Sequence, residues 1–200
     1  ILQKLIDEEV RKDWMMEVED LAHGFRPARM ALIPKKSFEA FKGSFEDMKA
    51  SELKKYFRIV EDYRRSSTND RVEMHETNTV PGYSSLSEML TGLRGLSRKY
   101  DLEYTLFESD VESAYRILPI SAEEQHCVGV QIGNRKFVHK RVPMGLRSSA
   151  YLWSREYSSL HRALRVLMWL AANAGLCLLD DNFWAIPKCI KGEAAAILLL

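Results

Sequence analysis

Two adjacent carboxylates, Asp180 and Asp181, lie in the stretch AGLCLLDDNFWAIP between apolar runs and with no basic residue beside them. Like charges at neighbouring positions repel each other, and apolar flanks remove the water that would screen them. A divalent cation would compensate this repulsion, because carboxylate oxygens are hard ligands that suit Mg²⁺ or Mn²⁺. The pattern therefore indicates a metal site, with the acid pair at the bend of a hairpin.

Another carboxylate is expected from elsewhere in the chain, since magnesium usually takes one or two carboxylates and leaves its other positions to water and phosphate oxygens. Asp110 is the candidate, because it ends the predicted strand YTLFESD after an apolar run. The alternative interpretation is a solvated turn, since Asp and Asn are common turn residues and a strand ending in Asp is ordinary. The surrounding segments must decide between the two.

Composition restricts the class of protein only weakly. The 200 residues carry a formal net charge of +1, which argues neither for nor against nucleic acid, membrane or an acidic partner. Three cysteines, Cys127, Cys177 and Cys189, are odd in number and lack C-x-x-C spacing. This favours a reducing, intracellular compartment, cytoplasmic or nuclear, over disulfides or a zinc site.

Neither a membrane span nor a signal peptide is expected. The apolar run 166–179 is interrupted by Asn173 and Gly175 and is shorter than the roughly 20 residues that a span needs. The first residues, ILQKLIDEEVRKD, are charged and helical in pattern. Because the sequence does not begin with Met and ends in AAAILLL, we expect it to be a piece of a longer chain.

Hydrophobic periodicity predicts the elements that must position these acids. In the first half it predicts helices over 1–22, 38–50 and 86–99, a strand beginning at 57, and a polar loop over 66–85. The first helix rests on the spacing of Ile6, Val10, Trp14, Val18 and Leu21. The second has Phe38, Phe41, Phe45 and Met48 on one face.

The second half of the chain is predicted to be richer in strands. The pattern indicates a strand over 104–110, a hairpin over 126–142 turning at Gly133-Asn134, a helix over about 150–172, and a hairpin of LCLL and FWAI with Asp180-Asp181 at its bend. The long helix is expected to face inward with Leu152, Leu160, Leu164, Leu167 and Ala171. Helices and strands do not alternate regularly, which favours an α+β fold.

A basic segment adds an electrostatic signal. Between Gln125 and Arg155 there is no acidic residue, whereas the basic residues include Arg135, Lys136, Lys140, Arg141 and Arg147, interleaved with aromatic ones. Such a segment suits a nucleic-acid backbone. The alternative is a solvated face, because alternating strands would divide these residues between two faces.

Four segments, taken in order, resemble the reverse transcriptases of retroelements. FRIVEDYRR resembles the fingers motif R-x-x-x-D-x-R (Arg58, Asp62, Arg64). FESDVESAYRILPI resembles the palm motif F-x-x-D with an aromatic five residues later (Phe107, Asp110, Tyr115). RVPMGLRSSAYLWSR resembles the P-x-G-L loop and its following helix (Pro143, Gly145, Leu146), and CLLDDNF stands at the place of Y-x-D-D. With ALIPKKS near residue 34, the resemblance covers about residues 1–200.

The resemblance implies an RNA-directed DNA polymerase that works with two Mg²⁺ (or Mn²⁺) ions. Asp110 and Asp180 would be the main metal ligands, with the Val111 carbonyl assisting and Asp181 completing the charge near the primer end. Phosphoryl transfer needs positioning and charge neutralisation more than covalent help. The implied partners are deoxynucleoside triphosphates and an RNA or DNA template with its primer.

The resemblance also implies four nucleotide contacts. Arg58 would clamp the triphosphate with its fork of donors, and Lys36, or its neighbour Lys35, would be a second clamp. Tyr115 would lie under the sugar and exclude a 2′-hydroxyl, and Gly145 would let the backbone approach the nucleotide and template. The alternatives are a solvated lysine, a partly buried tyrosine and an ordinary loop glycine.

The implied fold is the right-hand polymerase arrangement, in which helices back an antiparallel palm sheet. Fingers would comprise about 1–102 and 121–149, and palm about 103–120 and 150–200, with the thumb absent and further domains of a longer polyprotein outside the sequence. Leu178 replaces the tyrosine of Y-x-D-D, which puts efficiency in question but touches no metal ligand. Without a thumb, this piece alone is expected to bind a duplex weakly and to be poorly active or inactive.

Two other functions fit parts of the pattern. One is a non-catalytic relic or domesticated reverse-transcriptase-like domain that binds nucleic acid. The other is a metal-dependent nuclease or phosphatase that uses the same carboxylates. An RNA-dependent RNA polymerase shares the acidic motifs, but an aromatic residue at position 115 is not expected there.

Overall fold

The computed structural model describes residues 1–167, 175–179 and 181–188, and its chain divides into two compact units. Unit 1 comprises Ile1–His75 and Tyr115–Ser149, and unit 2 comprises Glu76–Ala114 and Ala150–Leu200. Residues 76–102 therefore belong to unit 2 and residues 115–120 to unit 1.

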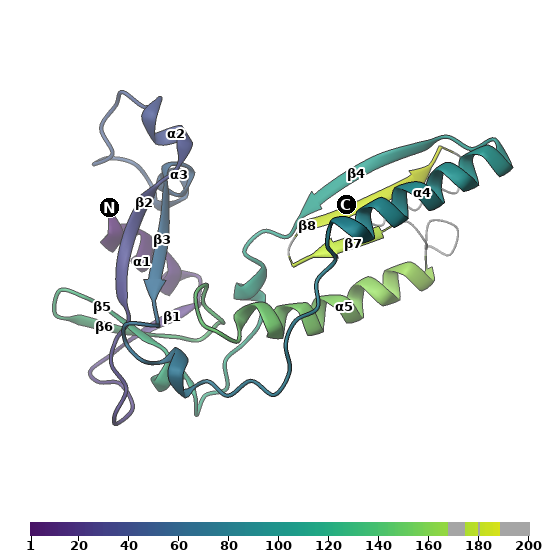
Figure 1. The fold of residues 1–200 in the computed structure, drawn as a ribbon. Helices are drawn as coiled ribbons and strands as arrows, with labels where there is room; N and C mark the ends of the chain where they lie inside the picture. The colour runs from purple at the N-terminus through teal and green to yellow at the C-terminus, as the bar shows by residue number, and fades with distance from the viewer. Residues whose placement is uncertain (168–174, 180, 189–200) are drawn as a thin grey trace. The chain divides into compact units, whose positions relative to one another are not determined.

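Unit 1 contains two small antiparallel sheets with short helices. One sheet has the strand order β1-β6-β5, and the other pairs β2 with β3 (Figure 1). Its elements are α1 (Leu2–Arg11), β1 (Met15–Val18), β2 (Arg29–Pro34), α2 (Lys36–Glu39), α3 (Ala50–Tyr56), β3 (Phe57–Asp62), the 3₁₀ turns η1 (Asn69–Arg71), η2 (Ala114–Ile117) and η3 (Gln125–Cys127), β5 (Gly129–Ile132) and β6 (Arg135–His139). Its core gathers Ile6, Met15, Tyr63, Val130 and Phe137, each at most 1% exposed.

The predicted helix over 1–22 is wrong beyond residue 11. The chain takes a left-handed conformation at Asp13 (φ 57°), which ends the helix, and Met15–Val18 forms β1. There Met15 pairs with His139 of β6, more than 100 residues along the chain. The spacing of apolar residues fits a helix locally, but this non-local pairing overrides it.

The predicted helix over 38–50 is also wrong. The structure has one turn of helix at α2 and a separate α3. The rings of Phe38, Phe41, Phe45, Tyr56 and Phe57 instead form a cluster with neighbouring centroids 4.4–5.6 Å apart. Contacts between aromatic rings replace the single helical face that the spacing suggested.

The hairpin predicted over 126–142 is confirmed. β5 and β6 pair antiparallel with Ile132 opposite Arg135, so Gly133-Asn134 is a two-residue turn. Gly133 has φ 57°, the left-handed conformation that such turns need. The strand expected to begin at 57 is β3, and its partner β2 was not predicted.

Unit 2 is built on one three-stranded antiparallel sheet with the order β4-β8-β7. The strand predicted over 104–110 is β4 (Tyr104–Asp110), and the predicted hairpin consists of β7 (Gly175–Leu178) and β8 (Asp181–Pro187). The helix predicted over 86–99 is longer, α4 (Tyr83–Tyr100), and the long helix is α5 (Ser149–Leu167), with 168–172 outside the described residues.

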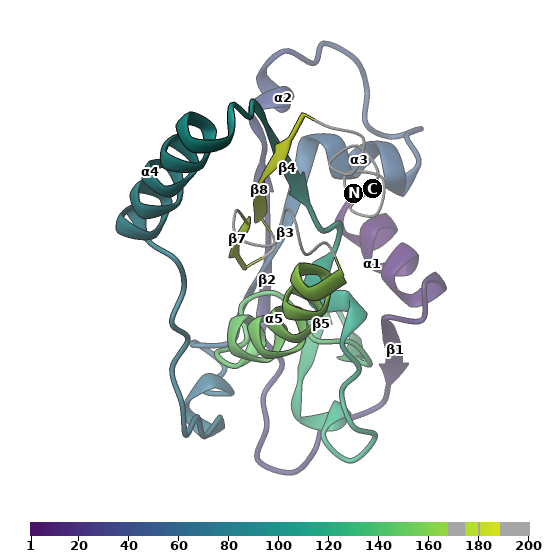
Figure 2. The ribbon, with the colours of Figure 1, turned by 90° about the vertical axis from the view of Figure 1, so that its right-hand side faces the viewer.

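The two helices pack against opposite faces of β8 (Figures 1 and 2). Leu93 of α4 contacts Ala185, which is fully buried, whereas His161 of α5 stacks on the neighbouring Trp184 with ring centroids 4.4 Å apart. Successive side chains of a strand point to opposite faces, so Ala185 and Trp184 assign one helix to each face.

The prediction of which face of α5 is buried is wrong. Leu152 and Leu160 are 39% and 52% exposed, whereas Trp153 and His161 are 4% and 7% exposed. Trp153 also stacks on Tyr157 at 4.8 Å, so the packed face follows steps of four through aromatic rings. Leu164 is half-buried, the Leu167 side chain is not described and Ala171 lies outside the described residues.

The sheet of unit 2 makes a matched pair of glycine substitutions informative. A Cβ at Gly175 would come within 2.4 Å of the Trp184 ring, so Gly175→Ala is expected to lower the free energy of unfolding of unit 2 by about 1–3 kcal/mol. Gly92 and Gly95 of α4 have open space around them. Gly92→Ala and Gly95→Ala are therefore each expected to raise the free energy of unfolding of unit 2 by about 0.5–1 kcal/mol. Native-state hydrogen exchange of unit 2 amides measures both; equal effects at Gly175 and Gly92 would contradict the packing described.

Candidate active site

The carboxylates of β4 and β8 are brought together by strand register. Asp110 is directly opposite Asp181 in the antiparallel pair, so their side chains share one face with about 4.5–5.5 Å between Cα atoms. Both residues are exposed. Val111 follows Asp110 directly, whereas Asp180 lies outside the described residues. The structure thus brings Asp110 together with the second acid of the pair.

The turn that joins β7 to β8 has an unusual backbone. Leu178 pairs with Asp181, and of the two residues between them the structure describes Leu179. Leu179 has φ 59°, a left-handed conformation that costs free energy for a residue with a Cβ. Trp153 of α5 donates its indole N–H to the Leu179 carbonyl at 2.9 Å, and Cys177 Sγ lies 3.4 Å from the same oxygen. The backbone at Leu179 is therefore held by a hydrogen bond from α5.

Polar contacts behind the acids hold the two strands. Asn182 is 2% exposed, and its amide nitrogen donates to the Ser109 carbonyl of β4 at 3.4 Å. Burial raises the pKa of Tyr157 despite its hydrogen bond with Asn182. Asn182 directly follows Asp181 and Ser109 precedes Asp110, so these bonds restrain the backbone beside both carboxylates.

A divalent cation fits the chemistry of this strand pair, because Asp110 and Asp181 present carboxylate oxygens toward one side. Among the described residues, no group of three or more His, Cys, Asp or Glu side chains converges on a metal position.

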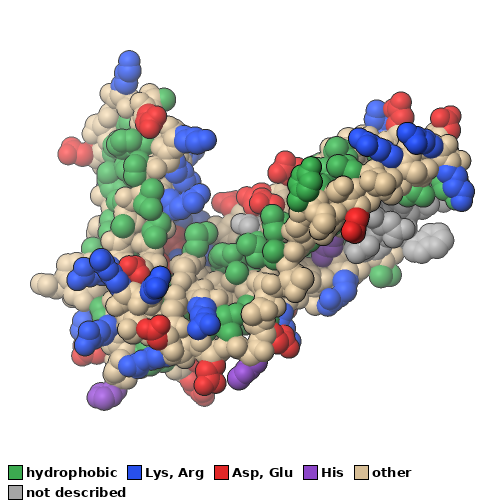
Figure 3. All heavy atoms as spheres, viewed as in Figure 1, with side chains coloured by type: hydrophobic (Ala, Val, Ile, Leu, Met, Phe, Trp, Pro, Cys, Tyr) green, Lys and Arg blue, Asp and Glu red, His purple; other side chains and the backbone are tan. Residues whose placement is uncertain are grey.

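The two predicted phosphate clamps belong to unit 1, one on the β2–β3 sheet and one directly after β2. Arg58 is opposite Ile33 on the exposed face, and Lys36 begins α2 just after β2 ends. Lys35 donates to the Lys54 carbonyl at 2.6 Å, which leaves Lys36 as the better candidate of the two lysines. Figure 3 shows hydrophobic side chains gathered over β2 and β3 beside blue Lys and Arg groups; Ile33 and Val60 are 48% and 37% exposed.

Gly145 lies in a loop that leaves no room for a side chain. Its φ is 97°, and a Cβ would come within 2.9 Å of the Glu61 carbonyl oxygen of β3. Sequence reasoning missed the partner of this loop, Asn69. Its amide nitrogen donates to the Gly145 carbonyl at 3.1 Å, and its oxygen accepts from the Arg147 backbone N–H at 2.8 Å. The only signal for Asn69 was its place in a polar loop.

A buried charge network is the other feature of unit 1 that sequence reasoning missed. Glu61 of β3 lies 3.2 Å from His139 Nε2, accepts a hydrogen bond from the Tyr63 hydroxyl at 2.8 Å, and lies 3.8 Å from Arg116. Burial alone would raise the pKa of Glu61, but His139, Arg116 and Tyr63 outweigh it and hold that pKa below its usual range. The same burial and the Glu61 carboxylate raise the pKa of Tyr63.

The predicted nucleic-acid surface is partly neutralised. Arg135 pairs with Glu17 at 2.7 Å and with Asp7 at 3.2 Å, Lys136 pairs with Asp20 at 2.5 Å, and Lys140 pairs with Asp13. These acids come from residues 7–20, so the absence of acids within 125–155 did not reveal them. Among the ion pairs of the described residues, Arg141 and Arg147 have no acidic partner.

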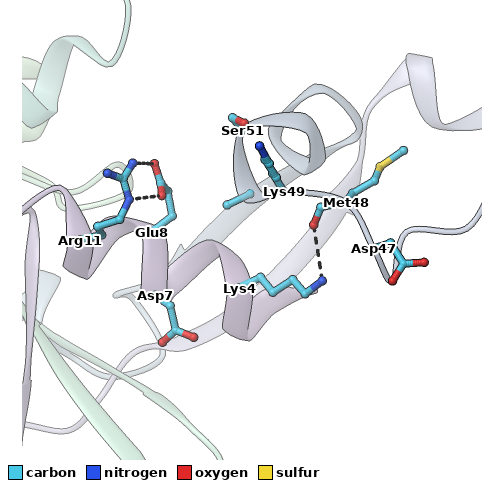
Figure 4. A pocket seen from close by; sticks show the side chains of 9 residues that line it. Lys4, Asp7, Glu8, Arg11, Asp47, Met48, Lys49 and Ser51 are labelled. Carbon is cyan, nitrogen blue, oxygen red and sulfur yellow. Dashed lines mark hydrogen bonds and ion pairs between the residues drawn. The ribbon is translucent and has the colours of Figure 1, made fainter.

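A hollow between α1 and the start of α3 gathers charged residues but none of the predicted site residues (Figure 4). Arg11 pairs with Glu8 at 2.7 Å, and Lys4 donates to the Met48 carbonyl at 3.4 Å. Its charges are therefore largely used within the protein.

The predicted site residues divide between the units. Asp110, Val111 and Asp181 belong to unit 2, whereas Arg58, Lys36, Tyr115, Gly145 and the five basic residues belong to unit 1. Each unit is described by itself. No helix in the described part of the chain is long and apolar enough to cross a membrane.

The structure resembles solved structures of foamy virus protease-reverse transcriptase. The selenomethionine-labelled CSH mutant of the prototype foamy virus protein matches with a TM-score of 0.64 at 14% identity, over 99% of this chain and 22% of that chain. The complex with an RNA/DNA hybrid gives 0.63 at 16% identity, over 99% and 22% of the two chains, and a complex with double-stranded DNA gives 0.58 at 16%, over 99% and 27%.

These matches show a reverse-transcriptase-like fold of mixed helices and antiparallel sheets. The chain spans 22% to 27% of the length of these three chains. No family model and no curated protein matches the sequence.

The depressed pKa of Glu61 predicts how the stability of unit 1 depends on pH. Because the folded-state pKa lies below the usual 4.5, the carboxylate stabilises the fold above that pH, and this contribution is lost as the pH falls through the lower, folded-state pKa. Glu61→Gln is expected to cost about 3 kcal/mol at pH 7 and progressively less below pH 4.5.

Hydrogen exchange of unit 1 amides at pH 7 and below pH 4.5 measures this effect. Glu17→Gln is the control, because the pKa of Glu17 is also lowered, by Arg135, but its ion pair is exposed to solvent. A constant cost of Glu61→Gln at both pH values would contradict the assignment.

Proposed function

We propose that this chain is the core of an RNA-directed DNA polymerase from a retrotransposon-like element, with the right-hand polymerase arrangement of fingers and palm. The observation that carries the proposal is the register of β4 with β8, which sets Asp110 opposite Asp181, the residue that directly follows Asp180 in the sequence. The reverse-transcriptase-like fold supports it. The elements of unit 2 would form most of the palm, and those of unit 1 most of the fingers.

Asp110, Asp180 and Asp181, with the Val111 carbonyl, would hold two Mg²⁺ or Mn²⁺ ions. Such ions activate the attacking hydroxyl and neutralise the leaving pyrophosphate. The chain's own contribution is to hold the carboxylates in register, through Asn182 and through the bond from Trp153 to Leu179. Rigid placement of this kind is what phosphoryl transfer requires of a protein.

The incoming deoxynucleoside triphosphate would meet residues of unit 1. Arg58 and Lys36 would bind its phosphates, Tyr115 would exclude a 2′-hydroxyl, and Gly145 would let the backbone approach, in a loop that Asn69 already holds. Arg141 and Arg147 are the better candidates for contact with the template and primer. Arg135, Lys136 and Lys140 would first have to exchange their exposed acidic partners for phosphate, which costs little. Intracellular action, cytoplasmic or nuclear, follows from these substrates.

Primer extension with Mg²⁺, on RNA and on DNA templates, tests the reaction in the full-length protein encoded by the open reading frame. Asp110→Asn, Asp180→Asn and Asp181→Asn are each expected to reduce extension about a hundredfold or more while the fold is kept, because each removes a negative charge from the proposed metal site. Glu108→Gln is the matched control, since Glu108 lies two residues from Asp110 on the same face of β4.

The outcomes separate the alternatives. Retained extension in Asp110→Asn, or equal loss in Glu108→Gln, would contradict the site. No extension by the unmodified protein favours a relic that binds nucleic acid. Cleavage of nucleic acid without added nucleotide favours a nuclease.

Tyr115→Val is expected to admit ribonucleotides, because it removes the ring that would clash with a 2′-hydroxyl. The measurement is the ratio of kcat/KM for a deoxynucleotide to that for the matching ribonucleotide, which should fall about tenfold or more. Tyr83→Val is the control, since Tyr83 is 88% exposed at the start of α4. An unchanged ratio in Tyr115→Val would remove its role as a sugar gate.

A further inference from the structure

Arg116 directly follows Tyr115 in η2, and its guanidinium is the centre of the buried network of unit 1. Its side chain is 15% exposed, and the carboxylates of Glu9 and Glu61 lie 3.3 Å and 3.8 Å from its Nη2. Its Nη1 lies 2.7 Å from His139 Nδ1 and donates to the Arg141 carbonyl at 3.3 Å. The guanidinium also lies over the Trp14 ring, with Arg116 Cζ 5.9 Å from the ring centroid. The Arg116 side chain thus contacts five other residues of unit 1.

The hydrogen bond between Arg116 and His139 fixes the proton position on the imidazole. Arginine has no acceptor, so His139 Nδ1 must accept and the ring proton belongs on Nε2. His139 Nε2 lies 3.2 Å from Glu61 Oε2 without hydrogen-bond geometry, and the Tyr63 hydroxyl donates to the same oxygen. His139 is fully buried, so the series Arg116–His139–Glu61 is shielded from water.

The network holds the segment of Tyr115 to the rest of unit 1. On the other side of that segment, Arg141 Nη1 donates to the Ile117 carbonyl at 3.1 Å, and the Val142 N–H donates to the Leu118 carbonyl at 3.0 Å. Leu118 N–H closes the turn on the Tyr115 carbonyl at 3.1 Å. The backbone of Tyr115 is therefore restrained by the turn itself and by the anchored side chain of the next residue.

The same network reaches the strand that carries Arg58. Glu61 is three residues from Arg58 in β3, and the two side chains point to opposite faces, one buried and one exposed. A shift of the Arg116 guanidinium would therefore act on Tyr115 through the backbone and on Arg58 through Glu61.

We infer that Arg116, held by Glu61 and His139, is a positioning residue that sets the place of Tyr115 and thereby the discrimination between deoxyribose and ribose. This inference rests on the proposed function, because only there does Tyr115 contact the sugar. A clash with one hydroxyl depends on sub-ångström placement, so loosening the anchor should reduce discrimination more than it reduces extension.

The test is Arg116→Lys in the full-length protein, with Arg65→Lys as matched control. Lysine keeps the charge but has a single nitrogen, which cannot serve His139, Glu9 and the Arg141 carbonyl together. Arg65 is 71% exposed and pairs only at 3.9 Å with Asp62. In Arg116→Lys the ratio of kcat/KM for deoxynucleotide to ribonucleotide should fall about tenfold, with extension retained, and in Arg65→Lys it should not change.

A double mutant separates positioning from general loosening of the fold. If Arg116 acts through Tyr115, Arg116→Lys should not lower the ratio further in a Tyr115→Val background. His139→Asn keeps an acceptor oxygen near the Nδ1 position and should retain more discrimination than His139→Leu. Additive loss in the double mutant, or an unchanged ratio in an active Arg116→Lys variant, would overturn the inference.

A readout without catalysis keeps the inference separate from the proposed function. With 3-fluorotyrosine at position 115, Arg116→Lys should shift or broaden the ¹⁹F resonance, whereas Arg65→Lys should leave it unchanged. An unaltered resonance in Arg116→Lys would overturn the positioning role, whether or not the protein extends a primer. Absence of extension by the unmodified protein would overturn the polymerase and, with it, the sugar selection.

Discussion

The pairing register of β4 with β8 is the constraint on which the candidate site depends. Side chains alternate along a strand, so a slip of one residue would move Asp181 to the face opposite Asp110. Packing several residues away prevents that slip. Trp184 fits beside Gly175 only because Gly175 has no Cβ, and Ala185 is fully buried beside Leu93 of α4. A pattern of large and small apolar residues thus determines where two charged ones lie.

In unit 1 the segments are fixed by directional polar contacts, whereas in unit 2 the strand register is fixed by close apolar packing. Glu9, Glu61, Arg116 and His139 come from α1, β3, η2 and β6, and each is at most 15% exposed. A buried ion pair adds little net stability compared with an apolar replacement, but loss of one member leaves an uncompensated charge. Such a network therefore tolerates few alternative arrangements of the four segments, which would suit the nucleotide contacts proposed for Arg58, Tyr115 and Gly145.

Sequence reasoning succeeded where the signal was local and failed where it was not. The strand ending at Asp110 and the turn at Gly133-Asn134 follow from alternation and turn chemistry. The prediction of a helix through residue 22 was wrong because Met15 pairs with His139. The predicted inward face of α5 was wrong because the aromatic rings of Trp153 and His161, and not the leucines, are buried. The buried network was invisible because its members are far apart in the sequence and charged residues are normally exposed.

The two units treat their acids differently, and this contrast bears on function. The buried acids of unit 1, Glu9 and Glu61, have cationic partners, whereas no ion pair among the described residues includes Asp110 or Asp181. Like charges directly opposite on paired strands are destabilising, and the adjoining turn adds a strained Leu179. Both features lie at one hairpin end, where Trp153 and Asn182 hold the backbone through hydrogen bonds. Both carboxylates are exposed, so water screens part of their repulsion, and a divalent cation at the proposed site would neutralise the rest.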